Sequence, residues 1–207
     1  MDVESAKVKK IFSVEQGVVL TPEFSPSGSR IVAGITRDEA SDVIEMDLDG
    51  KNLKNLTNHW SIDLWPTYSP DGRQMLMISD RTGAPQVYRM GADGSDPVRI
   101  SYFGSYNQSP AWAPRVNKIA YAAREFGKYT IYIIDENGGE PYALTADIGN
   151  NCEYPTFSPD GRALMFSCAT PAGRALWLRT TNDSYTKQLT KGTAVETNPD
   201  WGPLPAE

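Results

Sequence analysis

Histidine is nearly absent from this sequence, since His59 is the single one among 207 residues. A metal or lyase centre built on several histidines is therefore excluded. The sequence also lacks the Gly-x-Ser-x-Gly nucleophile motif and any glycine-rich phosphate loop. No serine or cysteine lies in a nucleophile context with which His59 would act. These absences predict a protein that is not an enzyme and that holds no metal and no cofactor.

Long apolar runs and an excess of positive charge are missing as well. No stretch approaches the roughly 18 apolar residues of a membrane span, which argues against direct membrane insertion. The opening residues, MDVESAKVKKIFSVEQ, lack the apolar stretch of a secretory signal. Either the protein stays in the cytoplasm, or the numbering begins after a signal has been removed. The formal net charge of −6 disfavours nucleic acid as a partner.

One phrase, by contrast, recurs along the whole chain. PEFSPSGSR begins at Pro22, PTYSPDGRQ at Pro66, PAWAPRVNK at Pro110 and PTFSPDGRA at Pro155, and PDWGP begins at Pro199. Successive prolines are 44 or 45 residues apart. A period of this length is typical of propeller blades.

The second copy shows the plan of one repeat. An alternating segment at 65–69 leads into the turn 69–72, whose Ser, Pro and Gly fit a type I turn. Strand-like runs follow at 74–79, 86–90 and 97–101, and polar turns separate them. Each fourth strand ends in an apolar residue followed by Thr or Ser. Because no helical period is found, each repeat is expected to form four short antiparallel strands.

Sheets of this kind cover one another when they stack around an axis, which gives a β-propeller. The sequence thus predicts an all-β fold in a single domain over 1–207. The blades are expected at 18–57, 62–101, 106–145 and 151–190, with flanking strands at 7–12 and 196–202.

Two further expectations concern single positions of the repeat. The third copy replaces Ser-Pro-x-Gly with a turn ending in Val116, which should keep negative φ throughout because valine is strained at positive φ. The aromatic residues that recur at one repeat position are expected in the core: Phe24, Tyr68, Trp112, Phe157 and Trp201.

Several of these stretches resemble the TolB family, the periplasmic propeller proteins of the Tol–Pal system. The resemblance rests on residues 79–112, on IYIIDENGGEPYALT at 131–145 and on the terminal PDWGP. It implies a periplasmic location and a six-bladed ring, of which this chain would supply four complete blades. It also implies that the smaller α/β domain of the family, which contacts TolA, has no counterpart here.

Much of this pattern is shared by TolB-like repeats in general, so two functions stay open. The first is a non-enzymatic protein-binding scaffold that supports outer-membrane integrity and cell division. The alternative is the substrate-gating propeller of a prolyl-oligopeptidase-type serine peptidase, whose hydrolase domain would lie outside this sequence.

Loops that precede the first strands meet around the channel of a propeller, and TolB proteins bind Pal, the peptidoglycan-associated lipoprotein, at that face. The resemblance therefore implies a Pal-type lipoprotein and other Tol-system proteins as partners. Aromatic side chains among amides and carboxylates also suit a protein interface. The residues assigned to it are His59, Trp60, Asp63, Tyr106, Asn107, Gln108, Asn150, Asn151, Glu153, Glu196 and Asn198. Alternatively, the carboxylates hold water or a cation in the channel. Trp65 and Tyr154 are expected to pack between blades.

The two cysteines are too few for a disulfide scaffold, and their spacing does not fit a CxxC motif. If the turn 159–162 joins two paired strands, Phe157 faces Leu164 and Cys152 lies near Cys168. In an oxidising periplasm such a pair forms a cross-strand disulfide. The alternative is two free buried thiols.

Overall fold

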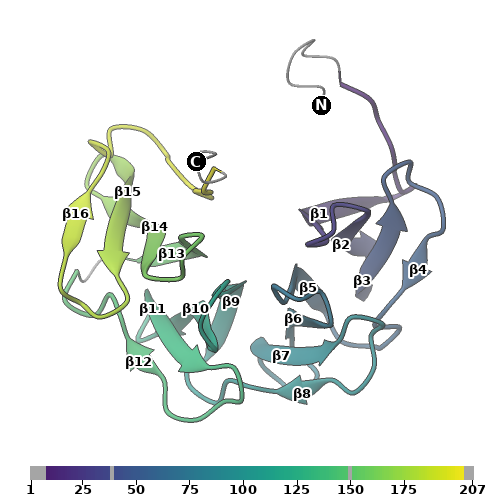
Figure 1. Ribbon diagram of the computed structural model, residues 1–207, viewed down its shortest axis with the longest axis horizontal. Coiled ribbons are helices and arrows are strands. Elements are labelled where there is room, and N and C mark those ends of the chain that lie inside the picture. The colour runs from purple at the N-terminus through teal and green to yellow at the C-terminus, as the bar shows by residue number, and fades with distance from the viewer. Residues whose placement is uncertain (1–7, 38–39, 149–150, 203–207) are drawn as a thin grey trace.

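The computed structural model describes residues 8–37, 40–148 and 151–202. Within them the chain forms four separate four-stranded antiparallel sheets, each with its strands in sequence order. The sheets lie side by side in an arc that is open on one side (Figure 1). The strands are, sheet by sheet, β1 (Gly17–Phe24), β2 (Arg30–Arg37), β3 (Ala40–Asp47) and β4 (Lys54–Asn55); β5 (Asp63–Tyr68), β6 (Gln74–Ser79), β7 (Gln86–Gly91) and β8 (Val98–Arg99); β9 (Tyr106–Trp112), β10 (Lys118–Glu125), β11 (Lys128–Asp135) and β12 (Tyr142–Ala143); and β13 (Cys152–Phe157), β14 (Ala163–Thr170), β15 (Gly173–Thr180) and β16 (Thr186–Gln188).

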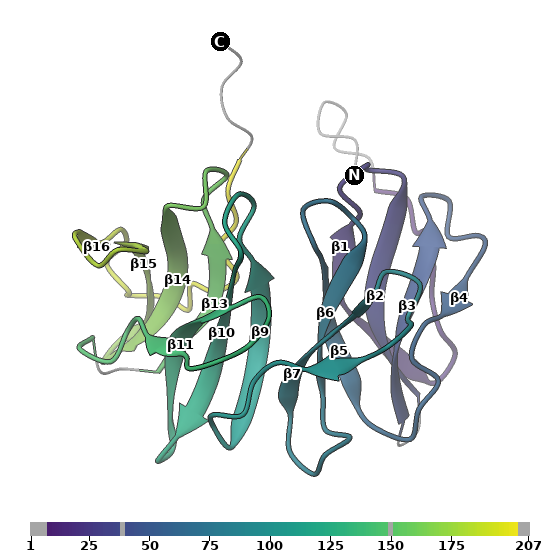
Figure 2. The ribbon, with the colours of Figure 1, turned by 60° about the horizontal axis from the view of Figure 1, so that its bottom comes forward.

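The four sheets are propeller blades. In each, the first strand (β1, β5, β9 or β13) lies toward the centre of the arc and the fourth lies at the outer rim (Figure 1). This confirms the all-β fold with four-stranded blades. The blades stand upright in Figure 2, so each has two ends. We call one end the turn face, formed by the turns between first and second strands. The other is the loop face, formed by the loops before the first strands and the hairpins between second and third strands.

A serine organises the turn between the first and second strands. Ser69 Oγ accepts the backbone N–H of Gln74 at 2.9 Å and donates to Asp71 at 2.7 Å. Ser158 makes the corresponding two bonds at 3.0 and 2.6 Å. Gly72 has a φ of 70°, which glycine adopts without a steric penalty. The repeated Ser-Pro-Asp-Gly phrase is therefore the sequence of a single hydrogen-bonded turn.

The third copy builds its turn differently. None of residues 113–117 has a positive φ, which confirms the expectation drawn from Val116. Instead the carbonyl of Val116 accepts the N–H of Lys118 at 2.7 Å. The turn thus reverses the chain without a glycine.

A threonine or serine after each fourth strand pairs with the third strand. The N–H of Val43 donates to Thr57 Oγ1 at 2.9 Å, and its carbonyl accepts the N–H of Leu56 at 2.8 Å. Both bonds recur with the same lengths in the other blades, where the hydroxyls belong to Ser101, Thr145 and Thr190. The apolar–hydroxyl signature therefore extends the pairing of a fourth strand that is otherwise very short.

A β-bulge precedes each repeated proline of the first strands. The register slips there in all four sheets. The residue before the proline has positive φ, namely Thr21 (48°), Trp65 (52°), Ser109 (51°), Tyr154 (57°) and, in the terminal segment, Asn198 (51°). Residues before proline are normally extended. Because proline has no N–H for the ladder, the pairing breaks at this point, and the extra residue bends the strand.

Apolar side chains fill the space between neighbouring blades. Tyr121 and Phe166 are completely buried there. Tyr68, Trp112 and Phe157 are buried as expected, and Trp201 is half-buried. The expectation for Phe24 is wrong, because 64% of this residue is exposed. Phe24 belongs to the first described blade, and no preceding sheet in the described residues covers its ring.

Hydrogen bonds also join successive blades. Thr67 Oγ1 and the N–H of Tyr68 both donate to Glu23 at 3.0 Å, which links the first strands of blades one and two. At the outer side, Arg89 donates to the carbonyl of Glu136 at 2.8 Å and links blades two and three. Packing and hydrogen bonding therefore both run from one blade to the next.

The flanking strands expected at 7–12 and 196–202 are not formed. Residues 8–14 and 196–202 belong to no strand, and residue 7 lies outside the described residues. The first segment still occupies the place of a fourth strand, because the carbonyl of Ile11 lies against Gly50 as that of Leu56 lies against Gly94. A strand needs a neighbour that completes its ladder, and within the described residues neither segment has one.

Candidate partner-binding face

The loop face contains the residues that the sequence assigns to a partner. It lies at the lower edge of Figure 2. The loops before β5, β9 and β13 bring residues from consecutive blades together, and the hairpins between second and third strands border them. The structure divides the described assigned residues into a buried, a half-buried and an exposed group.

Asp63, at the start of β5, belongs to the buried group, because none of its surface is exposed. Its carboxylate accepts hydrogen bonds from Ser61 Oγ at 2.9 Å and from Arg81 Nη2 at 3.0 Å. His59 Nδ1 lies 2.8 Å from the same Ser61 Oγ. The assignment of Asp63 to the partner surface is therefore wrong, since this ion pair fixes the loop before β5 from within.

Asn107, the second residue of β9, is also completely buried. The two N–H groups of its Nδ2 are shared among three acceptors: Gln86 Oε1 at 2.9 Å, Ser101 Oγ at 2.8 Å and the carbonyl of Phe103 at 3.0 Å. A buried amide with three such bonds orders the loop before β9. Its assignment to the partner surface is therefore wrong as well.

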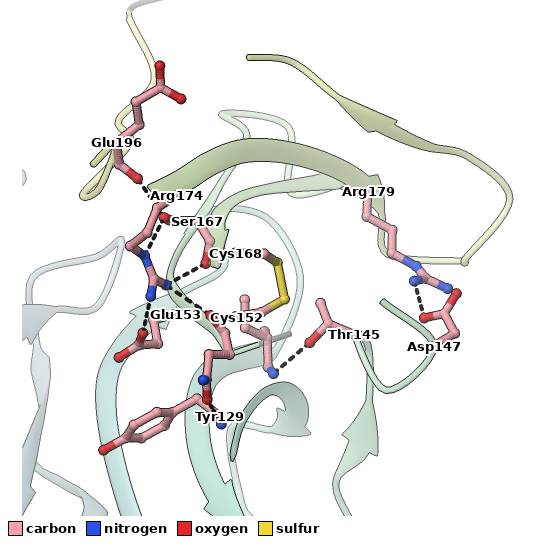
Figure 3. Close-up of a disulfide and its surroundings, with 12 residues drawn as sticks. Tyr129, Thr145, Asp147, Cys152, Glu153, Ser167, Cys168, Arg174, Arg179 and Glu196 are labelled. Atoms are coloured by element: carbon pink, nitrogen blue, oxygen red, sulfur yellow. Dashed lines mark hydrogen bonds and ion pairs between the residues drawn. A yellow bond between two sulfur atoms is a disulfide. The ribbon is translucent and has the colours of Figure 1, made fainter. Parts of the chain in front are cut away.

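Gln108 and Glu153 join blades three and four. Gln108 Nε2 donates to Glu153 Oε1 at 2.6 Å, and Glu153 Oε2 pairs with Arg174 Nη1 at 2.7 Å. Arg174 lies in β15 and also donates to Ser167 Oγ at 2.9 Å (Figure 3). The sequence reasoning missed Arg174, because nothing in the local sequence indicates that this one arginine turns inward.

Asn151 connects the loop before β13 to the neighbouring blade. Its Oδ1 accepts the N–H of Tyr129 at 2.9 Å, and its carbonyl accepts Arg174 Nη2 at 3.0 Å. Asn151 is half-buried, so part of its surface faces solvent on the loop face. Asn150 lies outside the described residues.

Glu196 and Asn198 belong to the segment that follows β16. The carbonyl of Glu196 accepts Ser167 Oγ at 2.5 Å, and its carboxylate accepts the hydroxyl of Thr190. Glu196 is thus held by contacts within the chain. Asn198 is exposed and lines the central groove rather than the loop face.

Cys152 and Cys168 form a disulfide between β13 and β14, with an S–S distance of 1.99 Å and a Cα–Cα distance of 4.1 Å. The register pairs Cys152 with Cys168 and Phe157 with Leu164, as the sequence predicted. The bond lies beside the Arg174 network (Figure 3). Closing a loop of 16 residues contributes about 3 kcal/mol in the chain-entropy model.

Aromatic side chains remain exposed on the loop face. Trp60 is 72% exposed, Tyr102 74% and Tyr106 37%. Trp60 lies against the half-buried His59, with ring centroids 5.1 Å apart. Phe126, in the hairpin between β10 and β11, is fully exposed at 102%. The sequence reasoning missed it, although Phe-Gly between two strand patterns is an unusual hairpin turn that gave a signal.

A groove of about 790 Å³ lies along the innermost strands at the centre of the arc. Trp65 and Tyr154, which were expected between blades, both line it, and Trp65 also packs on the core between blades two and three. Burial raises the pKa of Glu23 in this groove, and hydrogen bonds from Thr67 and Tyr68 offset part of that rise. Among the described residues no three His, Cys, Asp or Glu side chains cluster as metal ligands.

In the part of the chain that the structure describes, no helix has the length and hydropathy needed to cross a bilayer.

Comparison with known proteins now identifies the fold. A model of the TolB beta propeller domain matches residues 1–205. The chain belongs to the TolB β-propeller family. Among curated protein sequences, none matches this member of the family.

Solved TolB structures are similar to this TolB-like propeller. TolB from Acinetobacter baumannii has a TM-score of 0.77 and 27% identity, and the match covers 89% of this chain and 46% of that one. A putative TolB from Agrobacterium tumefaciens has a TM-score of 0.79 and 18% identity, with 91% and 67% covered. This chain therefore spans about half the length of the A. baumannii protein.

A hydrolase has a similar propeller fold. Puromycin hydrolase has a TM-score of 0.64 and 17% identity, and the match covers 83% of this chain and 28% of that one. At this identity the similarity shows the fold alone.

Proposed function

We propose that this chain is a non-enzymatic protein-binding scaffold of the periplasm, which binds a Pal-type lipoprotein at its loop face and so supports the outer membrane and cell division. Membership of the TolB family supports the choice of system and compartment. The observation that carries the binding surface is the exposure of Trp60, Tyr102, Tyr106 and Phe126 on one face. Exposed aromatic residues on a rigid scaffold are characteristic of protein interfaces. On a surface without a partner they would lower the solubility of the protein.

The buried polar residues support this function indirectly. The Asp63–Arg81 pair, the Asn107 amide and the disulfide hold the loops in place. Loops that are already ordered lose little conformational entropy on binding, which raises affinity. In this proposal the buried polar groups fix the shape of the loop face, and the exposed aromatic side chains contact the partner.

Calorimetric titration of the folded chain with the soluble domain of a purified Pal-type lipoprotein tests this proposal. We expect saturable binding that Trp60→Ala weakens by roughly tenfold, the usual effect of removing an interface tryptophan. Tyr185→Ala is the matched control, because Tyr185 is 51% exposed at the outer rim, beside β16. Absence of binding by a chain with native circular dichroism, or equal loss in both variants, would overturn the proposal.

A further inference from the structure

The hairpin between β10 and β11 has an unusual tip. Glu125 pairs with Lys128, so the loop consists of only Phe126 and Gly127. Both have positive φ, 45° and 81° respectively. This is the pattern of a type I′ turn, which Asn, Asp and Gly favour at the first position. Phe126 therefore holds a conformation that its side chain disfavours.

Packing does not compensate for this conformation. Phe126 is fully exposed, so its ring buries no apolar surface within the molecule. The other described tips on this face carry no aromatic residue, because the β6–β7 hairpin has the sequence DRTGAP at 80–85 and the β14–β15 hairpin carries Pro171 and Ala172. Strained residues of this kind cluster at functional and ligand-binding sites.

The surroundings of Phe126 have the composition of an interface. Tyr106, Arg124 and Tyr129 form one row across β9, β10 and β11 directly behind the tip. The rings of Tyr106 and Tyr129 meet edge to face, with centroids 6.5 Å apart. Arg124 and Lys128 are exposed, and within the described residues neither takes part in an ion pair.

Neighbouring blades hold this row in place. The N–H of Tyr129 donates to Asn151 Oδ1 at 2.9 Å, and Asn151 precedes the disulfide-bonded Cys152. Tyr129 lies close to the disulfide and the Arg174 network (Figure 3). The tip therefore projects from a fixed base.

We propose that Phe126 is the anchor residue of the loop face: its ring enters an apolar pocket of a folded protein partner, and carboxylates at the rim of that pocket pair with Arg124 and Lys128. This inference rests on the proposed function, because it names the contact through which the scaffold binds. An aromatic side chain that fills a pocket, bordered by arginine, is the usual composition of a binding hot spot. The free cations complement a carboxylate rim, and rim charges mainly accelerate association.

A lipid surface is the other candidate for an exposed phenylalanine beside basic residues. One ring inserts little apolar area, and stable membrane attachment needs a larger apolar face or several signals. The chain as a whole carries a formal charge of −6, which opposes approach to anionic lipid. The observations therefore favour the protein partner.

The decisive variant is Phe126→Asn, because Asn-Gly is the preferred type I′ pair. We expect Tm to rise by about 2–4 °C, as relief of the turn strain would give in a domain of this size. Affinity for the soluble domain of a Pal-type lipoprotein should fall by at least roughly tenfold, and Phe126→Ala should weaken it equally. A more stable protein that binds less well separates recognition from folding.

The second arm tests the rim charges. Arg124→Gln and Lys128→Gln should each lower the association rate a few-fold at low ionic strength, and the effect should vanish at high salt. Tyr185→Ala again provides the control that removes an exposed aromatic residue at the outer rim.

Three results would overturn the inference. If both Phe126 variants bind as the parent does while Trp60→Ala weakens binding, the proposed function stands and Phe126 is not the anchor. If the unmodified chain binds no Pal-type domain, both proposals fail. If the chain binds vesicles of phosphatidylethanolamine and phosphatidylglycerol and Phe126→Asn abolishes that binding, the tip recognises lipid instead.

Discussion

On the turn face blades two and four make the same bonds, whereas on the loop face blades two, three and four each use a different one. Ser69 and Ser158 make matching bonds within their turns. Three residues before the repeated proline, one position of the loop face is occupied by Asp63, Asn107 and Cys152. An ion pair, an amide network and a disulfide serve the same place.

This contrast shows at which face the repeat fixes the residue types and at which face it leaves them free to vary. A turn has one geometry, so the residues that build it are the same in every copy that keeps it. The loop face only requires that the start of the first strand be fastened to a neighbouring segment, which is the β6–β7 hairpin for Asp63, β7 of the preceding blade for Asn107 and β14 for Cys152. Because many polar or covalent contacts achieve that, the sequence there is free to differ between blades and to serve a partner.

We expect the largest effect from a variant that breaks the loop-face ion pair of blade two. Asp63→Ala leaves Arg81 without its carboxylate in a nearly buried position, and should lower the free energy of unfolding by about 3–5 kcal/mol. Urea unfolding measures it. Arg73→Ala on the turn face is the control, since its contact with Asp71 spans 3.9 Å in solvent, and the change should be below about 0.5 kcal/mol. Similar losses in both variants would contradict the contrast.

The loop-face bond of blade four can be broken chemically. Removal of the disulfide by Cys152→Ala with Cys168→Ala should cost about 3 kcal/mol of unfolding free energy. Reductant should destabilise the parent by a similar amount and leave the double variant unchanged, as followed by urea unfolding. If complete reduction of the disulfide leaves the unfolding free energy of the parent unchanged, this prediction is wrong.

Loss of the turn-face serine bonds should cost less unfolding free energy, and the same amount in blades two and four. Ser69→Ala and Ser158→Ala both remove the hydroxyl that accepts a backbone N–H and donates to an aspartate. We expect each to lower the unfolding free energy by about 1–2 kcal/mol. Thermal unfolding of the two variants side by side measures the equality. A difference larger than about 1 kcal/mol would show that the turns are not equivalent.

The smallest effect concerns Glu23, which links blades one and two beside the groove. Burial raises its pKa above the ordinary 4.5. Because the folded pKa lies above the unfolded one, the contribution of Glu23 to stability is fully present below pH 4.5 and is lost as the pH rises through the folded pKa. Glu23→Gln keeps an acceptor for Thr67 and Tyr68 without the charge. Its unfolding free energy should therefore decline less than the parent's between pH 4.5 and 7, and a steeper decline would contradict this.

The fold was predictable because the repeat is local and periodic. Alternating strands, the Ser-Pro-Asp-Gly turn and the apolar–hydroxyl ending all express geometry within one blade. The pairing of Cys152 with Cys168 followed from the same turn. The bulge before each proline was not predictable, since the rule for residues before proline favours an extended chain, and Trp65 at positive φ contradicts it.

The candidate site was harder to predict because burial depends on contacts between distant segments. Asp63 and Asn107 have the polar character of surface residues, and only their contacts with Arg81 in the β6–β7 hairpin and with Gln86 in β7 reveal that they lie inside. The one feature of the sequence that sets them apart is that both lie three residues before the repeated proline. Trp60 is exposed on the loop face to which the sequence assigned it. Phe126 was missed because it lies in a hairpin between second and third strands, and only the loops before the first strands were searched for partner-binding residues.

Contacts that pass only between adjacent blades also govern how order is lost. In a stack with nearest-neighbour coupling, each unit is stabilised by the units on either side of it. Blades two and three have two neighbours each in the described arc, whereas blades one and four have one (Figure 1). Amide protons of β6 and β10 should therefore exchange with solvent slowest, and those of β2 and β14 sooner. The blades would therefore unfold from the two ends of the arc toward its middle.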